Sequence, residues 1–116
     1  PSKSKFNSSK ISLSIGDIYN RNNLINDLSN IGYIRESLVT NIGEFGVRGF
    51  IIDIYPINLE NPIRIEFFDD QIDSIREFNP ETQKSIKNKG STTHFLYLFS
   101  NFKLYKNRKM TYAQKA

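Results

Sequence analysis

Two neighbouring stretches of alternating residues constrain the fold of this 116-residue chain more than any other feature. The first runs from Gly43 to Pro56 and reads GEFGVRGFIIDIYP, and the second runs from Pro62 to Asp70 and reads PIRIEFFDD. Both are rich in β-branched and aromatic residues and are bounded by Gly, Pro and Asn, which is typical of strands. Residues 57–61 form a link that is short enough for the two strands to pair in an antiparallel manner.

Alternation within the second stretch separates an apolar row from a polar row. Successive side chains of a strand point to opposite faces of a sheet, so every second residue shares a face. We expect the apolar row to pack on a core and the opposite row to face solvent. The apolar row is Ile63, Ile65 and Phe67, and the opposite row is Arg64, Glu66 and Phe68.

The first stretch also alternates, but its phase changes at Gly49. Phe45 and Val47 are in step before this glycine. A glycine at the point where the phase slips predicts either a β-bulge inside one long strand or a close approach of another part of the backbone. Such a bulge would redirect Arg48, the charged residue beside it. The residues in step after the glycine are Phe50, Ile52 and Ile54.

The remaining segments complete an α+β prediction. Residues 11–15, 33–39 and 73–78 are expected to be further strands, and the apolar run at 95–99 fits a buried edge strand. An apolar stripe at helical spacing predicts one helix that ends near Gly32. We therefore predict an antiparallel β-sheet of four to five strands with one helix packed on its apolar face. The stripe is formed by Leu24, Ile25, Leu28 and Ile31.

Charge is distributed unevenly along the chain. Residues 1–83 contain 8 Lys and Arg and 12 Asp and Glu, whereas residues 84–116 contain 8 Lys and Arg and no acidic residue. Residues 1–10 are expected to form a flexible lead-in and residues 105–116 a basic, solvated tail. Residues 11–104 would then form a single domain.

Residues suited to catalysis or metal binding are sparse. The chain has no cysteine, and its single histidine, His94, has no carboxylate partner at metal-ligand spacing. No phosphate-binding loop is present, and the cluster of Asp69, Asp70 and Asp73 fits turn chemistry better than a cation site. We therefore predict no catalytic residue, no metal and no cofactor.

The composition is that of an ordinary globular protein. No apolar run approaches the roughly 20 residues that a membrane span needs, and no signal-peptide pattern opens the chain. The absence of cysteine fits a reducing compartment. We expect a monomer in the cytoplasm without a membrane partner.

An ordered set of motifs resembles a known family. GYIR at residues 32–35 precedes GEFGVRG at 43–49, DIYP at 53–56, RIEFF at 64–68 and SIREFNPETQ at 74–83. This series, within a match from about residue 11 to residue 85, resembles the interaction module that bacterial transcription-repair coupling factors share with the excinuclease subunit UvrB.

The resemblance implies a non-catalytic docking module for UvrA, the damage-recognition protein of nucleotide excision repair. The ATP-dependent DNA translocase motor of the coupling factors is absent from these residues, and their contacts with RNA polymerase and double-stranded DNA would belong to other domains. Gly46 stands where UvrB has an additional arginine, which favours the coupling factors.

The resemblance also implies a set of partner-binding residues. Arg35 stands at the arginine of the first motif, Arg48 at that of the second, and Arg64 and Glu66 at the start of RIEFF; Phe68 would be an apolar anchor on the same face. We expect Arg48 and Arg64 to be exposed, so that reversing their charges leaves folding almost unchanged. The residues alone leave an alternative open, in which both arginines pair with Glu44, Glu66 or Asp53 and have a purely structural role.

A second function remains possible from the residues alone. The basic, aromatic C-terminal third is also the composition of a nucleic-acid-binding module, in which aromatic rings stack on bases and cations contact phosphates. Nothing in the sequence supports an enzymatic activity. The candidate stacking residues are Phe95, Tyr97, Phe99 and Tyr105.

Overall fold

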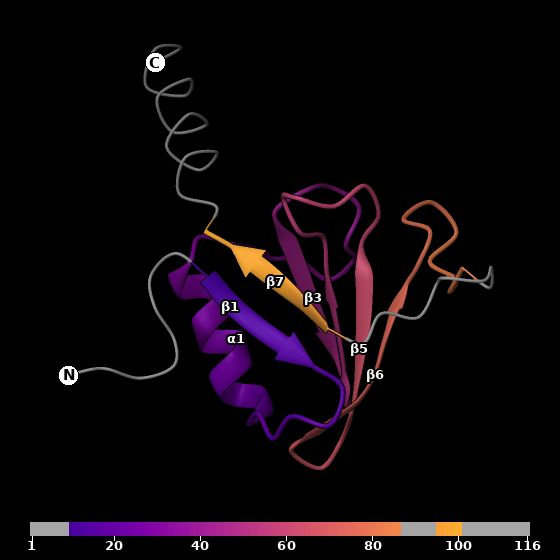
Figure 1. Ribbon diagram of the computed structural model, residues 1–116. Helices are drawn as coiled ribbons and strands as arrows, with labels where there is room; N and C mark the ends of the chain where they lie inside the picture. Colours follow the sequence, from indigo (N-terminus) through magenta and orange to yellow (C-terminus); the bar gives the residue numbers. More distant parts are fainter. Residues whose placement is uncertain (1–9, 87–94, 101–116) are drawn as a thin grey trace.

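The fold is described from a computed structural model, which covers residues 10–86 and 95–100. Five strands form one sheet in the order β2-β3-β4-β5-β6, and β1 and β7 form a second, two-stranded sheet (Figure 1). The elements are β1 (Lys10–Ser14), α1 (Arg21–Asn30), β2 (Ile34–Arg35), β3 (Glu44–Arg48), β4 (Ile51–Ile54), β5 (Ile63–Phe68), β6 (Gln71–Glu77) and β7 (Phe95–Phe99).

The larger sheet is mixed. Strands β3, β4, β5 and β6 pair with their neighbours in an antiparallel manner, whereas the short β2 pairs with β3 in parallel. The predicted α+β class, a sheet with one helix packed on it, is confirmed. The expectation of a wholly antiparallel sheet is wrong, because residues 36–43 loop back and the chain enters β3 in the same direction as β2.

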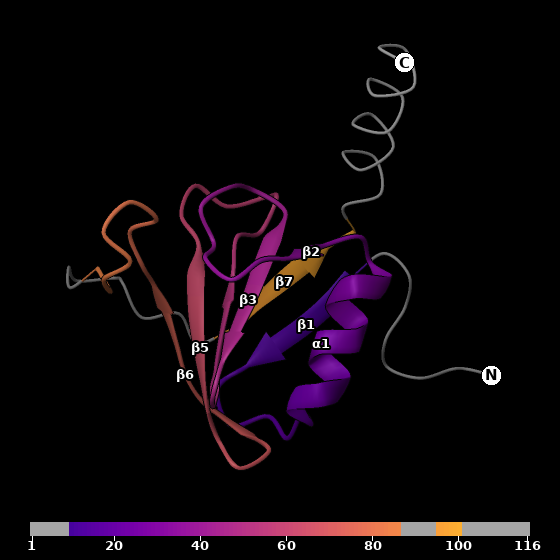
Figure 2. The ribbon, with the colours of Figure 1, turned by 180° about the vertical axis from the view of Figure 1, so that it is seen from behind.

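The strands predicted at the two ends of the domain are both present, but they do not join the larger sheet. β1 and β7 pair with each other, with Lys10 opposite Phe99 and Ser14 opposite Phe95. Both views of the ribbon show this two-stranded sheet and α1 on the same side of the larger sheet (Figures 1 and 2).

The long strand expected around Gly49 is a β-hairpin. Arg48 pairs with Ile51, so Gly49 and Phe50 form a two-residue turn between β3 and β4. Gly49 has a φ of 55°, and Phe50 is not among the described residues with positive φ. This pattern fits a type II′ turn, which requires glycine at its first central position. The predicted β-bulge is therefore wrong, because a tight turn at glycine shifts the phase of alternation as a bulge does.

A bulge does occur in β6. Glu66 pairs with Ser74 while Phe67 pairs with Ile72, which leaves Asp73 as an extra residue. The apolar residues Ile72 and Ile75 are three apart in the sequence, yet this extra residue lets both side chains enter the core.

The main core lies between the apolar face of the larger sheet and the elements that cover it. Ile65 is fully buried, as the alternation predicts, and it belongs to one cluster with the helical residues Leu24 and Leu28. The two-stranded sheet adds further apolar side chains, so the helix is not the sole cover. Its contributions are Ile11, Leu13, Leu96 and Leu98.

Parts of the predicted domain organisation lie outside the described residues. These are the lead-in, apart from Lys10 in β1, and the tail at 105–116. Among the described residues, no helix is long and apolar enough to cross a membrane.

The buried Tyr33 and the partly buried Tyr19 make the stability of the fold sensitive to alkaline pH. The hydroxyl of Tyr33 accepts a hydrogen bond from the backbone N–H of Ile57 at 3.1 Å. Burial raises the pKa of Tyr33 to about 12, although this hydrogen bond acts in the opposite direction. Burial also raises the pKa of Tyr19, and its hydrogen bond to the Asp27 carboxylate adds to the effect.

We predict that the free energy of unfolding falls as the pH rises from 10 to 12. In this range the unfolded chain releases the Tyr33 proton while the folded chain retains it. The contribution of Tyr33 to the free energy of unfolding is therefore fully present below pH 10 and is lost as the pH rises towards 12. Tyr33→Phe should make the fall of the unfolding free energy with pH less steep by about 1.4 kcal/mol per pH unit, which is the effect of one proton released on unfolding. Urea unfolding at several pH values measures this slope, and parallel curves for the two proteins would contradict the assignment.

Candidate protein-interaction face

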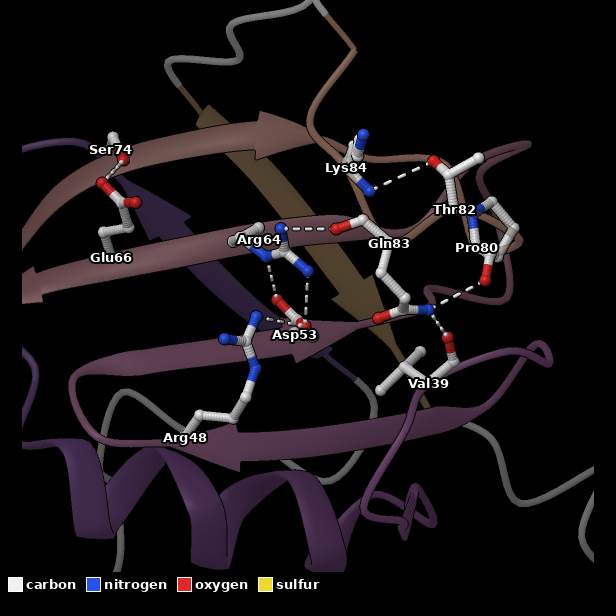
Figure 3. Close-up of polar contacts among 10 residues, drawn as sticks. All are labelled: Val39, Arg48, Asp53, Arg64, Glu66, Ser74, Pro80, Thr82, Gln83 and Lys84. Carbon is white, nitrogen blue, oxygen red and sulfur yellow. Dashed lines mark hydrogen bonds and ion pairs between the residues drawn. The ribbon is translucent and has the colours of Figure 1, made fainter.

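The polar face is defined here as the side of the five-stranded sheet opposite the main core. β3, β4 and β5 contribute Arg48, Asp53 and Arg64 to it, and β5 and β6 contribute Glu66 and Ser74 (Figure 3). These side chains share a face because residues that pair across antiparallel strands point to the same side.

A buried ion pair lies at the centre of the polar face. Arg64 donates two hydrogen bonds to Asp53, from Nε to Oδ1 at 2.8 Å and from Nη2 to Oδ2 at 3.0 Å (Figure 3). The side chains of Arg64 and Asp53 are 11% and 7% exposed. Two parallel bonds between a guanidinium and a carboxylate form the strongest common geometry for such a pair.

The guanidinium of Arg64 is enclosed on other sides as well. Its Nη1 donates to the backbone carbonyl of Gln83 at 2.9 Å. Its central carbon lies 4.4 Å from the centre of the Phe78 ring, a cation–π distance. Arg64 therefore has little surface left to offer a partner.

Gln83 ties the loop that carries the PETQ motif to the sheet. Its side-chain amide donates to the carbonyls of Val39 at 2.9 Å and Pro80 at 2.8 Å. Its backbone adopts a positive φ of 67°, which is uncommon for a residue other than glycine. Since its own carbonyl receives Arg64, this residue links three segments that are distant in sequence.

The segment after β2 lies against the polar face at Gly46. A Cβ atom at Gly46 would approach the carbonyl oxygen of Glu36 to 2.8 Å and a methyl group of Val39 to 3.3 Å. Real Cβ contacts with backbone are not this short, so any side chain here would displace the segment. This contact explains why glycine stands at position 46 of this chain.

Arg48, unlike Arg64, remains accessible on the polar face. Its Nη2 lies 3.5 Å from Oδ2 of Asp53, and its side chain is 54% exposed. The carboxylate of Asp53 thus holds one edge of the Arg48 guanidinium, while the rest of the side chain is open to a partner.

Glu66 and Phe68 extend this accessible region along β5. Glu66 is partly buried and accepts a hydrogen bond from the hydroxyl of Ser74 at 3.0 Å. Phe68 is 69% exposed. Arg48, Glu66 and Phe68 together supply a cation, an anion and an apolar ring, and we call these three residues the exposed patch.

Arg35 is not brought together with the other predicted residues. β2 pairs in parallel with β3, and Arg35 is opposite Phe45, whose side chain is in the core. Arg35 is therefore an exposed residue of the edge strand, on the side of the sheet that faces away from Arg48.

The structure decides how the arginines pair. Both Arg48 and Arg64 contact Asp53, while Glu44 accepts hydrogen bonds from the backbone N–H groups of Thr40 and Asn41. The expectation that Arg64 is exposed is wrong, because Asp53 of the neighbouring strand and the later PETQ loop enclose it. The expectation of exposure holds for Arg48.

Sequence reasoning left Asp53 as one of three possible partners of the two arginines, and it missed the parts that Phe78 and Gln83 have in enclosing Arg64. One signal for the pairing was present, since Asp53 interrupts an apolar run and a carboxylate in such a place needs a partner. Phe50, which the alternation placed in step with Ile52 and Ile54, is 58% exposed at the hairpin turn, where the guanidinium carbon of Arg21 lies 5.2 Å from its ring centre. In residues 10–86 and 95–100, no group of three or more His, Cys, Asp or Glu is arranged to hold a metal ion.

We predict that Asp53→Asn lowers the free energy of unfolding by about 3–5 kcal/mol, because it leaves the Arg64 charge buried without its counter-ion. The exposed Asp73→Asn is the matched control and should change stability by less than about 0.5 kcal/mol. Chemical denaturation of the two variants measures the difference. Equal stabilities would show that the buried pair contributes nothing to folding.

Comparison with known proteins identifies the family. The model of the UvrB interaction domain matches residues 11–95. The transcription-repair-coupling factors of Staphylococcus haemolyticus (strain JCSC1435) and Staphylococcus aureus (strain USA300) are each 51% identical to this chain over 79 residues.

These similarities cover 68% of this chain and 7% of each relative, so the chain spans about 7% of the length of the curated relatives it matches. The matched model describes an interaction domain and not a catalytic one, in agreement with the prediction of a non-catalytic module. The resemblance stated from the motifs is thereby confirmed. The chain belongs to the family of UvrB interaction domains.

Proposed function

We propose that this chain is the module through which a transcription-repair coupling factor docks a UvrA-type damage-recognition protein. The observation that carries the proposal is the exposed patch, in which Arg48 is 54% exposed and Phe68 is 69% exposed. The family supports an interaction role in transcription-coupled repair, and the patch supplies the chemistry for it.

The patch favours a partner surface with an acidic group and an apolar pocket. Arg48 would donate charge-assisted hydrogen bonds to a carboxylate, and Phe68 would fill the pocket. Glu66 would repel partners with a misplaced carboxylate, and such charge patterns set partner choice more than raw affinity.

Arg64 has an indirect part in this proposal. Its two bonds fix the position of the Asp53 carboxylate, and this carboxylate in turn holds the Arg48 guanidinium. Arg64 is therefore a positioning residue, and Arg48 makes the contact with the partner. Arg35 would contact only a partner that also reaches the β2 edge.

In the parent protein, docking would bring repair to a stalled RNA polymerase. The contacts with RNA polymerase and with double-stranded DNA, and the ATP-dependent translocation, would be functions of other domains. This module would act as a monomer in the cytoplasm.

We predict that Arg48→Glu weakens binding of a purified UvrA-type protein at least about 30-fold, which corresponds to about 2 kcal/mol. The substitution removes a charge-assisted contact and adds a repulsion, while the exposed side chain contributes little to folding. Lys10→Glu, on the two-stranded sheet, is the control reversal and should bind as the unmodified chain does. Calorimetric titration measures both affinities, with circular dichroism as the check on folding.

Two results would contradict this proposal. Equal binding by the Arg48→Glu and Lys10→Glu variants would remove Arg48 from the interface. Absence of binding by the unmodified chain would remove the docking function itself.

A further inference from the structure

A row of aromatic rings lies on the outer face of the two-stranded sheet. Phe95, Tyr97 and Phe99 are 51%, 38% and 41% exposed, whereas the alternate residues Leu96 and Leu98 are buried in the main core. Three exposed aromatic side chains on one strand are unusual, because apolar surface of this size is normally covered or functional.

The rings lie close together and form one surface. The centres of the Phe95 and Tyr97 rings are 4.9 Å apart at an angle of 77°, and those of Tyr97 and Phe99 are 6.2 Å apart at 50°. On the paired strand, Ser12 is opposite Tyr97 and Ser14 is opposite Phe95. Since serine side chains are small, they leave the rings accessible from the outside.

Positive charge accompanies this aromatic row. The ammonium nitrogen of Lys10 lies 4.3 Å from the centre of the Tyr97 ring. In the sequence, residues 1–10 contain three lysines and residues 100–116 contain five Lys and Arg, with no acidic residue in either segment. Because Lys10 is opposite Phe99, both basic segments are attached at the same end of the two-stranded sheet.

We propose that Phe95, Tyr97 and Phe99, with Lys10, form a binding site for single-stranded nucleic acid. Successive rings on a strand are separated by two residues, about 6.6–6.8 Å along the chain, so bases of an extended strand can stack on them in turn. Lys10, which lies against the Tyr97 ring, would contact a phosphate. Tyr105, another candidate stacking residue, lies outside the described residues.

The chemistry favours a single strand over the alternatives. In a duplex the faces of the bases are stacked on each other, so its phosphates could contact the positive charge but its bases could not stack on the aromatic rings. An apolar protein partner could pack on the rings but would offer no counter-charge to the basic residues beside them. The site is also independent of the docking proposal, since the leucines beneath it enter the core on the side of the larger sheet that faces away from the exposed patch.

The test is fluorescence anisotropy of the full 116-residue chain with labelled oligo-dT of about 15 nucleotides and with a duplex of the same length. The variant Phe95→Leu, Tyr97→Leu, Phe99→Leu retains apolar bulk and removes the aromatic faces. We expect it to lose affinity for oligo-dT at least about tenfold. Phe50→Leu, an exposed aromatic at the β3–β4 turn, is the matched control and should bind as the unmodified chain does.

The outcomes distinguish binding that depends on base stacking from binding that depends on charge alone. Tighter binding of oligo-dT than of duplex, lost in the triple variant and weakened by salt, would support the site. No binding of oligo-dT, equal binding by the triple variant, or duplex binding as tight as that of oligo-dT would each overturn it. Melting curves by circular dichroism control for folding, and if the triple variant is unstable, Tyr97→Leu alone must still reduce affinity for oligo-dT.

Discussion

The bidentate pair between Arg64 and Asp53 is the interaction on which the polar side of this domain depends. It joins β4 to β5 and, through the carbonyl of Gln83, fixes the PETQ loop against the sheet. Gln83 then holds the segment that follows β2 through the carbonyl of Val39. One carboxylate and one guanidinium thereby connect β4 and β5, the PETQ loop and the segment after β2 on the side of the sheet opposite the main core.

In this network the two motif arginines, Arg48 and Arg64, have different tasks although both contact Asp53. Arg64 is enclosed and maintains the structure, whereas Arg48 shares the same carboxylate and remains open to a partner. A rigid carboxylate beneath an exposed arginine reduces the side-chain entropy that binding would otherwise cost. The buried pair therefore serves the exposed patch by holding its cation in place.

Local sequence patterns predicted most of the helix and strand positions. Contacts between residues distant in sequence determined the pairing of the strands and the burial of their polar side chains. Alternation placed Ile65 in the core and Arg64 on the opposite face, because both follow from the period of a strand. The turn at Gly49 was mistaken for a bulge, since both shift the phase at a glycine. The pairing of β1 with β7 joins residues at opposite ends of the domain and leaves no local signal. Asp53 within an apolar run indicated a partner for Arg64, but the enclosure of Arg64 also requires a loop about twenty residues later, which no local pattern indicates.

The most direct test of the division between enclosed and exposed residues is amide hydrogen exchange of this chain with and without a purified UvrA-type protein. The account predicts slower exchange in the complex at the turn after Arg48 and at the turn after Phe68, with residues 80–85 unchanged. We expect these turn amides to exchange readily in the free protein, so a partner that covers them would slow their exchange measurably. Protection centred on residues 80–85, or no protection at either turn, would contradict the account.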